Sequence, residues 1–433
     1  MARAVPRIPP DRDLSIDFVR AICLPVVVLL HALQMGIAGD PLRAFNALAE
    51  WRPLTAITWV GMIMPTFFIA GGFAGITTWR RMHGAGGTAA EYIRARMLRL
   101  ARPVLFAMLG VLAAMGILAL CGADPEFLRT FAFRLAEPLW FIAVYAICTS
   151  FVPLMAALHR RAAWATYFTL AGLAVAVDLV DRSLHVPVGA LNWLFVWLFV
   201  QQLGFGVRDQ WYSRRPRRLL LVLALVAYAL MAVAVLGMGY DPDMIANLNP
   251  PTVLLLLLGL AQVYLFTLLQ PAIRAAMRQR PVLVGIGALG VFGMVVYLWH
   301  TVAMAVVVGA QLALGLPFPP VLTTTWWITR IPWVLAIVAV LAVLCLIVPR
   351  IERLWPAERA RRMPLWAALA CAVALVASVG WVLTQGYLTP GTGAAVVLLA
   401  AAIAWLTTGG PVQRTPVDAR ARRSDRTETG AQA

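Results

Sequence analysis

Apolar residues fill most of the chain in long runs, and short polar stretches separate these runs. Each run is close to the roughly 20 residues that an α-helix needs to cross the hydrocarbon layer of a membrane. The pattern predicts an all-α, polytopic helical membrane protein with about twelve transmembrane helices. The expected spans are 14–36, 55–79, 103–121, 138–157, 164–181, 188–207, 219–239, 252–270, 282–310, 326–348, 365–386 and 393–408.

Arginines and acidic residues alternate from one loop to the next. Arginine-rich stretches recur at the N-terminus, 80–102, 160–161, 208–218, 274–280, 350–362 and after 413, whereas the loops between them carry mainly acids such as Asp40, Asp124 and Asp241. Loops rich in basic residues stay in the cytoplasm. We therefore predict a multi-pass protein of the cell (plasma) membrane with both termini in the cytoplasm.

The composition narrows the class of protein further. Hydrophobic residues make up 62% of the chain, and 36 basic residues, all arginine, face 19 acidic ones. A net charge of +17 is also typical of nucleic-acid-binding proteins, but here the arginines lie in short loops between apolar runs. We interpret them as topology signals and contacts with anionic lipids, so no nucleic-acid partner is expected. The five cysteines lack CxxC spacing, and no metal site is expected.

The first span, 14–36, holds the most informative polar residues. Arg20 and His31 are eleven positions apart, which places them on one helical face about 16 Å apart along the axis. Asp17 precedes Arg20 by less than one turn. Ionisable groups inside a membrane span are costly, and they face a bundle interior or a watery cavity. The first span therefore predicts a polar site within the membrane.

Three further arginines recur at three-residue spacing where the chain enters the third span. Arg96, Arg99 and Arg102 are expected to share one helical face. Ordinary anchoring at the membrane surface accounts for arginines here, but a one-sided stripe also suits phosphate groups, which guanidinium forks bind in a bidentate manner. From the spacing alone, both interpretations stay open: surface anchoring and a phosphate-binding site formed by Arg96, Arg99 and Arg102.

Weaker candidates lie in the fourth and ninth spans. Glu137, at the outer rim, is a candidate contact for a polar substrate, and Trp140 fits either that role or an aromatic belt. His300 lies inside an apolar run, where a histidine is either a hydrogen-bonded structural residue or part of a site.

Five short motifs in chain order resemble acyltransferase family three, a family of integral membrane acyltransferases. They are Arg20-x10-His31, FFIAGGF (67–73), Arg96-x-x-Arg99, LWFIAVY (139–145) and YLWH (297–300). The wording around FFIAGGF and LWFIAVY is most similar to actinobacterial members. One departure is Gly71, which stands where the family has a serine.

The resemblance implies a ten-helix core that moves an acyl group, acetyl by default, from cytoplasmic acyl-CoA to a hydroxyl of a sugar, glycan or glycolipid. It implies His31 as the catalytic base, Arg20 as its partner or a donor-site cation, Arg96 and Arg99 as phosphate ligands and His300 as a secondary site residue.

The core then divides the chain into five segments. They are a cytoplasmic N-terminal segment (1–13), the acyltransferase core (14–348), a basic cytoplasmic loop (349–364), two additional transmembrane helices (365–408) and a disordered cytoplasmic tail (409–433).

Two alternatives stay open. Twelve spans with cytoplasmic termini are also typical of a secondary transporter, in which Arg20, His31 and His300 would be substrate or proton-relay groups. The two halves of the chain show no similarity to each other, which disfavours a repeat-built carrier. The other alternative is a non-catalytic membrane scaffold. The sequence does not name the acceptor, the acyl length or the oligomeric state.

Overall fold

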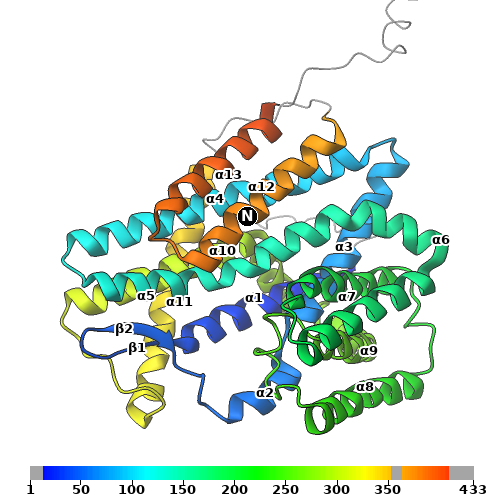
Figure 1. Ribbon diagram of the computed structural model, residues 1–433, viewed down its shortest axis with the longest axis horizontal. Coiled ribbons are helices and arrows are strands. Elements are labelled where there is room, and N and C mark those ends of the chain that lie inside the picture. Colours follow the sequence, from blue (N-terminus) through cyan, green and yellow to red (C-terminus); the bar gives the residue numbers. More distant parts are fainter. Residues whose placement is uncertain (1–12, 353–362, 409–433) are drawn as a thin grey trace, which may run out of the picture.

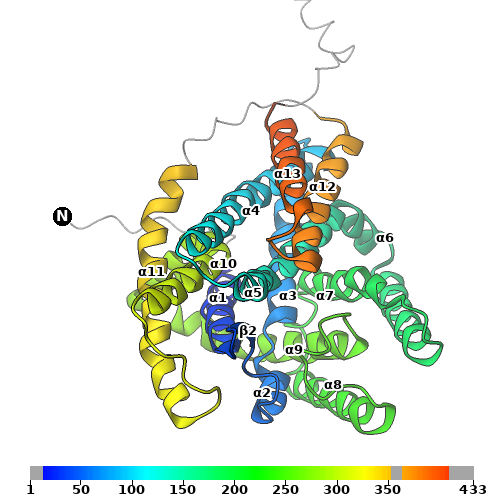
Figure 2. The same cartoon turned by 60° about the vertical axis from the view of Figure 1, so that its left-hand side comes forward.

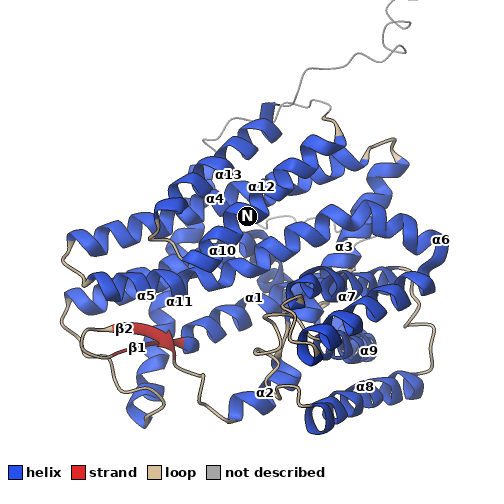
Figure 3. Cartoon of the chain, viewed as in Figure 1, coloured by secondary structure: helices blue, strands red, loops and turns tan. Residues whose placement is uncertain are grey.

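The computed structural model describes residues 13–352 and 363–408. The expectations for residues 1–12, for 353–362 of the basic loop and for the tail 409–433 lie outside the described residues. Helices make up almost all of the described chain, and one short hairpin is the only sheet in it (Figures 1 and 3). The prediction of an all-α polytopic membrane protein is confirmed.

The elements follow one another with short connections. The first part comprises α1 (Leu14–Gln34), β1 (Met35–Ala38), β2 (Arg43–Asn46), α2 (Pro53–Gly61), α3 (Met64–Gly84), α4 (Ala89–Leu120), α5 (Pro125–Ala136), the single turn η1 (Glu137–Leu139) and α6 (Trp140–Ser183). The second part comprises the turn η2 (Gly189–Leu191), α7 (Asn192–Arg208), α8 (Arg217–Met238), α9 (Val253–Ala276), α10 (Arg280–Ala313), α11 (Thr324–Glu352), α12 (Leu365–Gln385) and α13 (Pro390–Thr408).

Eleven helical segments of the described chain are long and apolar enough to cross a membrane. One of them contains α6, whose 44 residues would extend about 66 Å if straight, twice the thickness of the hydrocarbon layer. The backbone of α6 leaves the helical region at Ala162 (φ −154°, ψ 62°).

The two halves of α6 run in opposite directions. His159 before the break and Tyr167 after it both contact Gln202 near the end of α7, at 2.8 and 2.6 Å. The far ends of α6, at Trp140 and Asp178, both reach the first turn of α7. Because α6 supplies two crossings, the described helices supply twelve in total.

Polar contacts join the helix ends on the arginine-rich side of the bundle. Asp13, just before α1, forms an ion pair with Arg274 near the end of α9 at 2.8 Å, and Arg80 near the end of α3 pairs with Asp209 just after α7. We call this side the arginine-rich face. The hairpin, α2 and α5 lie at the other end of α1, which we call the opposite face (Figure 1).

Two elements of the opposite face were not predicted. The hairpin β1–β2 pairs Met35 with Asn46, and Gly39 occupies the left-handed region of its turn (φ 101°). The hairpin packs on the amphipathic helix α5, whose Thr130 hydroxyl accepts a hydrogen bond from the Ala44 amide at 3.1 Å. Together they place polar side chains beside the end of α1.

The FFIAGGF segment lies in α3 and packs tightly against α7. A Cβ at Gly72 would lie 2.1 Å from the backbone oxygen of Gln201, so only glycine permits this approach. The glycines of this motif therefore serve helix packing.

The last two helices, α12 and α13, form an antiparallel pair that packs on α4 and α6 (Figure 2). On the other side of the bundle, α11 packs mainly on α10 (Figure 2). The space between these groups is occupied by α1, α3 and the middle of α10, which carry the candidate site.

Candidate active site

His31 and His300 meet in the middle of the bundle. His31 lies in the last turn of α1 and His300 lies near the middle of α10, 269 residues later in the chain. Their Nδ1 and Nε2 atoms are 3.0 Å apart, and the ring planes are within 10° of parallel. His300 is fully buried, whereas His31 is partly accessible. The structure thus brings together histidines from the first and the last of the five motifs.

The surroundings of His300 determine which nitrogens carry protons in the neutral pair. Nδ1 of His300 contacts the backbone oxygen of Tyr297, and a carbonyl oxygen only accepts hydrogen bonds. Nδ1 of His300 is therefore the donor, and its Nε2 accepts from Nδ1–H of His31. Nε2 of His31 then carries the lone pair. This chain of contacts leaves Nε2 of neutral His31 able to accept a hydrogen bond.

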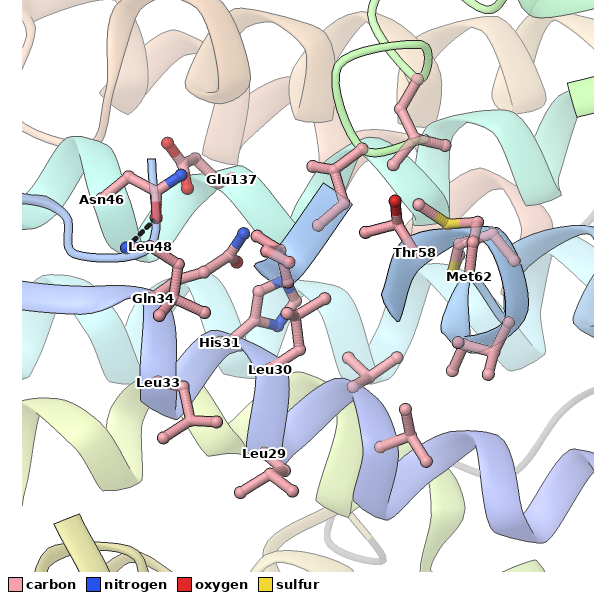
Figure 4. Close-up of a pocket in the computed structure, with 18 of the residues that line it drawn as sticks. Leu29, Leu30, His31, Leu33, Gln34, Asn46, Leu48, Thr58, Met62 and Glu137 are labelled. Carbon is pink, nitrogen blue, oxygen red and sulfur yellow. Dashed lines mark hydrogen bonds between the residues drawn. The ribbon is translucent and has the colours of Figure 1, made fainter. Parts of the chain in front are cut away.

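His31 faces a cavity of about 530 Å³ near the opposite face. Figure 4 shows His31 with Leu29 on one side, and with Asn46 and Glu137 on the other. The cavity wall combines apolar side chains of α1 and α2 with polar groups of α1, the hairpin, the region around η1 and a later loop. The polar lining residues are His31, Gln34, Asn46, Thr58, Arg134, Glu137 and Asn249, and Trp140 and Trp193 add aromatic surface. We call it the histidine cavity.

The charged groups of the histidine cavity neutralise each other. Arg134, in the last turn of α5, forms an ion pair with Glu137 three residues later. Both side chains are largely buried, and such a pair avoids leaving an uncompensated charge. Glu137 and Trp140, two candidate substrate contacts from the sequence, both line the histidine cavity.

A second cavity of about 750 Å³ begins at the arginine-rich face. Leu14 and Arg280, the first residues of α1 and α10, mark that end, and Asp17, Arg20 and Arg99 also line the wall. Among the described residues, Nε of Arg20 has no hydrogen-bond acceptor. We call this the arginine cavity. Its cations outnumber its single lining carboxylate, so it suits an anion.

Tyr297 is the residue that lines both cavities. It lies on α10 less than one turn before His300, and its hydroxyl donates a hydrogen bond to the backbone oxygen of Pro138. Phe141 packs edge-on against its ring, with the centroids 5.1 Å apart. Because α1 contributes Arg20 to one cavity and His31 to the other, a single helical face lines both in series, as its spacing predicted.

The predicted arginine stripe divides in two. Arg99 lines the arginine cavity and lies in electrostatic range of Arg20 and Arg96. The Arg96 guanidinium lies 5.4 Å from the centroid of the Tyr92 ring. Arg102, however, donates to the hydroxyl of Thr407 on α13 at 3.2 Å.

Helix geometry explains this division. Each three-residue step turns about 60° short of a full turn, so Arg102 is rotated about 120° from Arg96. Arg94, on the same side of α4 as Arg102, donates from Nε to the Leu406 oxygen of α13 at 2.7 Å. Cations stabilise the carbonyls at a helix C-terminus. These two arginines therefore attach α13 to α4.

Asp13 fixes the arginine-rich end of α1. It caps α1 through Ser15 and pairs with Arg274. Burial alone would raise its pKa, but hydrogen bonds from Arg274 and Ser15 outweigh that effect and hold the pKa of Asp13 below its ordinary value of 3.8.

Within residues 13–352 and 363–408, no three His, Cys, Asp or Glu side chains are grouped as a metal site. The groups that the two cavities offer for chemistry are a pair of histidines, a polar wall whose charges are paired and a cluster of arginines.

The acyltransferase family three model, described as an acyltransferase domain, matches residues 13–349. The match spans more than half of the chain, from the cap of α1 through most of α11. The chain belongs to acyltransferase family three. The resemblance inferred from the motifs is thereby confirmed. Its family makes the protein a membrane acyltransferase rather than a carrier or a scaffold. The similarity to actinobacterial members stays a prediction. No curated protein and no solved structure matches the chain.

Sequence reasoning missed several side chains that line the two cavities of the acyltransferase. Tyr297 lies within the YLWH motif that had drawn attention to His300, and Arg134 lies one helical turn before Glu137, a spacing that permits an ion pair. Gln34, Asn46 and Arg280 carried no recognisable signal, because only the folded chain brings the hairpin and the start of α10 to α1.

Proposed function

We propose that this acyltransferase moves an acyl group, acetyl by default, from acyl-CoA in the arginine cavity to a hydroxyl group in the histidine cavity. The acceptor is a sugar, glycan or glycolipid, and His31 is the general base. By the positive-inside rule the arginine-rich face is cytoplasmic, where acyl-CoA is available. Donor and acceptor then enter from opposite sides of the cell (plasma) membrane.

The observation that carries this proposal is the position of the histidine pair. His31 opens to one cavity, Arg20 and Arg99 line the other, and Tyr297 borders both. A donor held by its phosphates at the arginine-rich end is able to extend its thioester toward Tyr297. An acceptor hydroxyl beside His31 would approach the same point from the other side.

The chemistry requires a base and a proton donor in turn. Nε2 of His31 takes the proton from the acceptor hydroxyl as its oxygen attacks the thioester carbonyl carbon. The tetrahedral intermediate then expels the thiolate, breaking the C–S bond, and the protonated His31 returns the proton to sulfur. His300 accepts a hydrogen bond from Nδ1–H of His31 throughout, so it positions the base and stabilises its cationic form.

On the donor side, Arg20, Arg96 and Arg99 supply positive charge for the coenzyme's phosphates. Grouped cations repel one another in a partly buried site unless an anion neutralises them, and guanidinium–phosphate pairs are strong, charge-assisted contacts. Arg280 would add to this set at the entrance. Asp17 would balance Arg20 there rather than contact the acceptor.

On the acceptor side, Trp140 and Glu137 offer an apolar ring and a hydrogen-bond acceptor for a hydroxylated ligand. Gln34 and Asn46 add amide groups. Such a small set of polar groups in an otherwise apolar wall is typical of ligand sites that fix orientation.

The test is acyl-CoA turnover by the purified protein in lipid nanodiscs, measured as free thiol release from acetyl-CoA, alongside equilibrium binding of acetyl-CoA. We expect His31→Ala to lower turnover by about 10²- to 10⁴-fold, the contribution of a general base, with donor binding unchanged. The matched control is His185→Ala, since His185 is an exposed histidine of the opposite face. If acetyl-CoA and longer acyl-CoAs neither bind nor react, the proposed donor is wrong and the acyltransferase uses an acyl donor of another class.

A further inference from the structure

The histidine cavity borders the lipid as well as the bundle interior. Leu29 of α1 and Ile57 of α2 line the cavity, yet 46% and 51% of their surface is exposed. Both belong to segments long and apolar enough to span a membrane. Exposed apolar side chains of such segments face hydrocarbon. From these two side chains we infer a side opening of the cavity between α1 and α2, at the level of the helical turn before His31.

The lining of this cavity changes character from one end to the other. Val26, Leu29 and Ile57 make its membrane-facing end apolar. Its other end carries Gln34 and the Arg134–Glu137 ion pair, with the polar residues of the hairpin and the 240–252 loop.

His31 lies between the two ends, with Leu29 on one side and Asn46 and Glu137 on the other (Figure 4). A paired aromatic contact marks the rim. The rings of Trp51 and Trp327 lie 5.1 Å apart, and Trp side chains prefer the boundary between hydrocarbon and water. His31 thus lies at the depth where a bound amphiphile would have the junction between its hydrocarbon tail and its polar headgroup.

We propose that the acceptor is an amphiphile, with a hydroxylated headgroup and a single hydrocarbon tail, which enters the histidine cavity sideways from the bilayer. Its tail passes between Leu29 and Ile57, and its headgroup contacts Gln34 and Glu137. This places a hydroxyl close to the tail junction beside Nε2 of His31. The inference rests on the proposed function for the reaction, but the binding of the amphiphile is a separate property of the cavity.

The lateral route has a physical advantage. A tail that stays in hydrocarbon throughout is never transferred to water, and the membrane concentrates the acceptor at the depth of the base. A water-soluble sugar can reach the polar end of the cavity, but it makes no use of the apolar end.

The experiment compares ethyl, hexyl and decyl glucoside as acceptors and ligands in nanodiscs, below their micelle concentrations. We measure equilibrium binding of each glucoside and, separately, acetyl transfer from acetyl-CoA. We expect the apparent dissociation constant to fall by more than about tenfold from ethyl to decyl glucoside, since each methylene moved out of water strengthens association about fourfold.

Leu29→Trp narrows the opening. It is expected to raise the dissociation constant of decyl glucoside about tenfold, because the tail loses hydrophobic contact in the opening. The dissociation constants of ethyl glucoside and acetyl-CoA should stay unchanged. Ile22→Trp is the matched control, because Ile22 is another exposed residue of α1, at 40%, that does not line the cavity. Its binding profile should equal that of the wild type.

The outcomes separate the two proposals. Equal affinity for all three glucosides, or equal effects of Leu29→Trp and Ile22→Trp on decyl glucoside, overturns the lateral route. An effect of Leu29→Trp on ethyl glucoside as large as that on decyl glucoside also overturns it. Tail-dependent binding that Leu29→Trp abolishes supports the route, and if no acetyl transfer accompanies it, the proposed reaction alone is wrong.

Discussion

The two cavities share one face of α1 but differ in the balance of charged side chains that line them. Among the described residues that line the histidine cavity, the one arginine, Arg134, is paired with Glu137, and His31 contacts His300. Among those that line the arginine cavity, Arg20, Arg99 and Arg280 exceed the one carboxylate, Asp17. Under the proposed function, the first cavity serves the proton transfer and the second holds the phosphates of the donor.

This difference is informative because unpaired charge inside a membrane protein is costly. A bundle that keeps several guanidinium groups in a half-buried cavity lowers its own stability unless a ligand compensates. The histidine cavity carries no such cost. Under the proposed function, the two cavities hold one anionic and one uncharged ligand, on either side of Tyr297.

The largest expected loss of acyl transfer comes from removing the hydrogen bond between His300 and His31. His300→Phe removes the acceptor for Nδ1–H of His31, so His31 loses its tautomer and its orientation. We expect transfer to fall on the order of a hundredfold, with acetyl-CoA binding unchanged. His300→Gln is the control: its amide oxygen accepts the same hydrogen bond and should restore much of the rate. An equal loss in both variants would show that His300 serves packing only.

The next effect separates the two halves of the arginine stripe. Arg99→Ala removes a charged contact with the donor and should raise the dissociation constant of acetyl-CoA roughly tenfold to a hundredfold, corresponding to about 1.5–3 kcal/mol. Turnover at saturating donor should change little. Arg102→Ala is the matched control, because Arg102 contacts Thr407 of α13.

Equilibrium binding in nanodiscs decides between these two positions. If Arg102→Ala weakens donor binding as much as Arg99→Ala does, the helix face assigned to the phosphates is wrong. The expected consequence of Arg102→Ala is a lower unfolding temperature, because α13 loses an attachment to α4.

A smaller effect is expected when the boundary between the cavities is opened. Tyr297→Ala removes the ring that lines both, so water gains access to the thioester, and the ratio of acyl-CoA hydrolysis to transfer should rise several-fold. Tyr297→Phe keeps the ring, and its ratio should stay near that of the wild type. Thiol release with and without acceptor measures the ratio. A normal ratio in a folded Tyr297→Ala protein would contradict the role of Tyr297 as the boundary.

The smallest effect concerns stability at the entrance of the arginine cavity. The pKa of Asp13 is lowered in the folded protein, so its ion pair with Arg274 stabilises the fold above the ordinary pKa of 3.8 and is lost as pH falls through the lowered value. Because Arg274 is about half exposed, Asp13→Asn should cost less than about 1 kcal/mol at pH 7. Unfolding temperatures of both proteins should converge only once the pH falls below the lowered pKa of Asp13. A difference that persists there would assign the effect to the helix cap instead.

Much of the fold could be predicted from the sequence, because in a membrane the hydropathy of a segment largely determines its secondary structure. Runs of about 20 apolar residues must be helices, since the bilayer offers no water to satisfy an exposed backbone. The twelve crossings follow from this rule, including the break near Arg160 and Arg161, where two charges interrupt an otherwise continuous helix. The hairpin and α5 escaped prediction because their strands of four residues and helix of 12 residues are too short to give the hydropathy signal of a membrane span.

By itself, the sequence determined the membrane class, the family and the shared helical face of Arg20 and His31, because these depend on hydropathy, motif order and local helix geometry. Only the tertiary structure decided that His300 supports His31, that Tyr297 borders both cavities and that Arg102 faces α13 rather than Arg99's cavity. These are contacts between helices far apart in the chain. Their formation depends on how whole helices rotate and pack, and no local pattern of residues encodes that rotation.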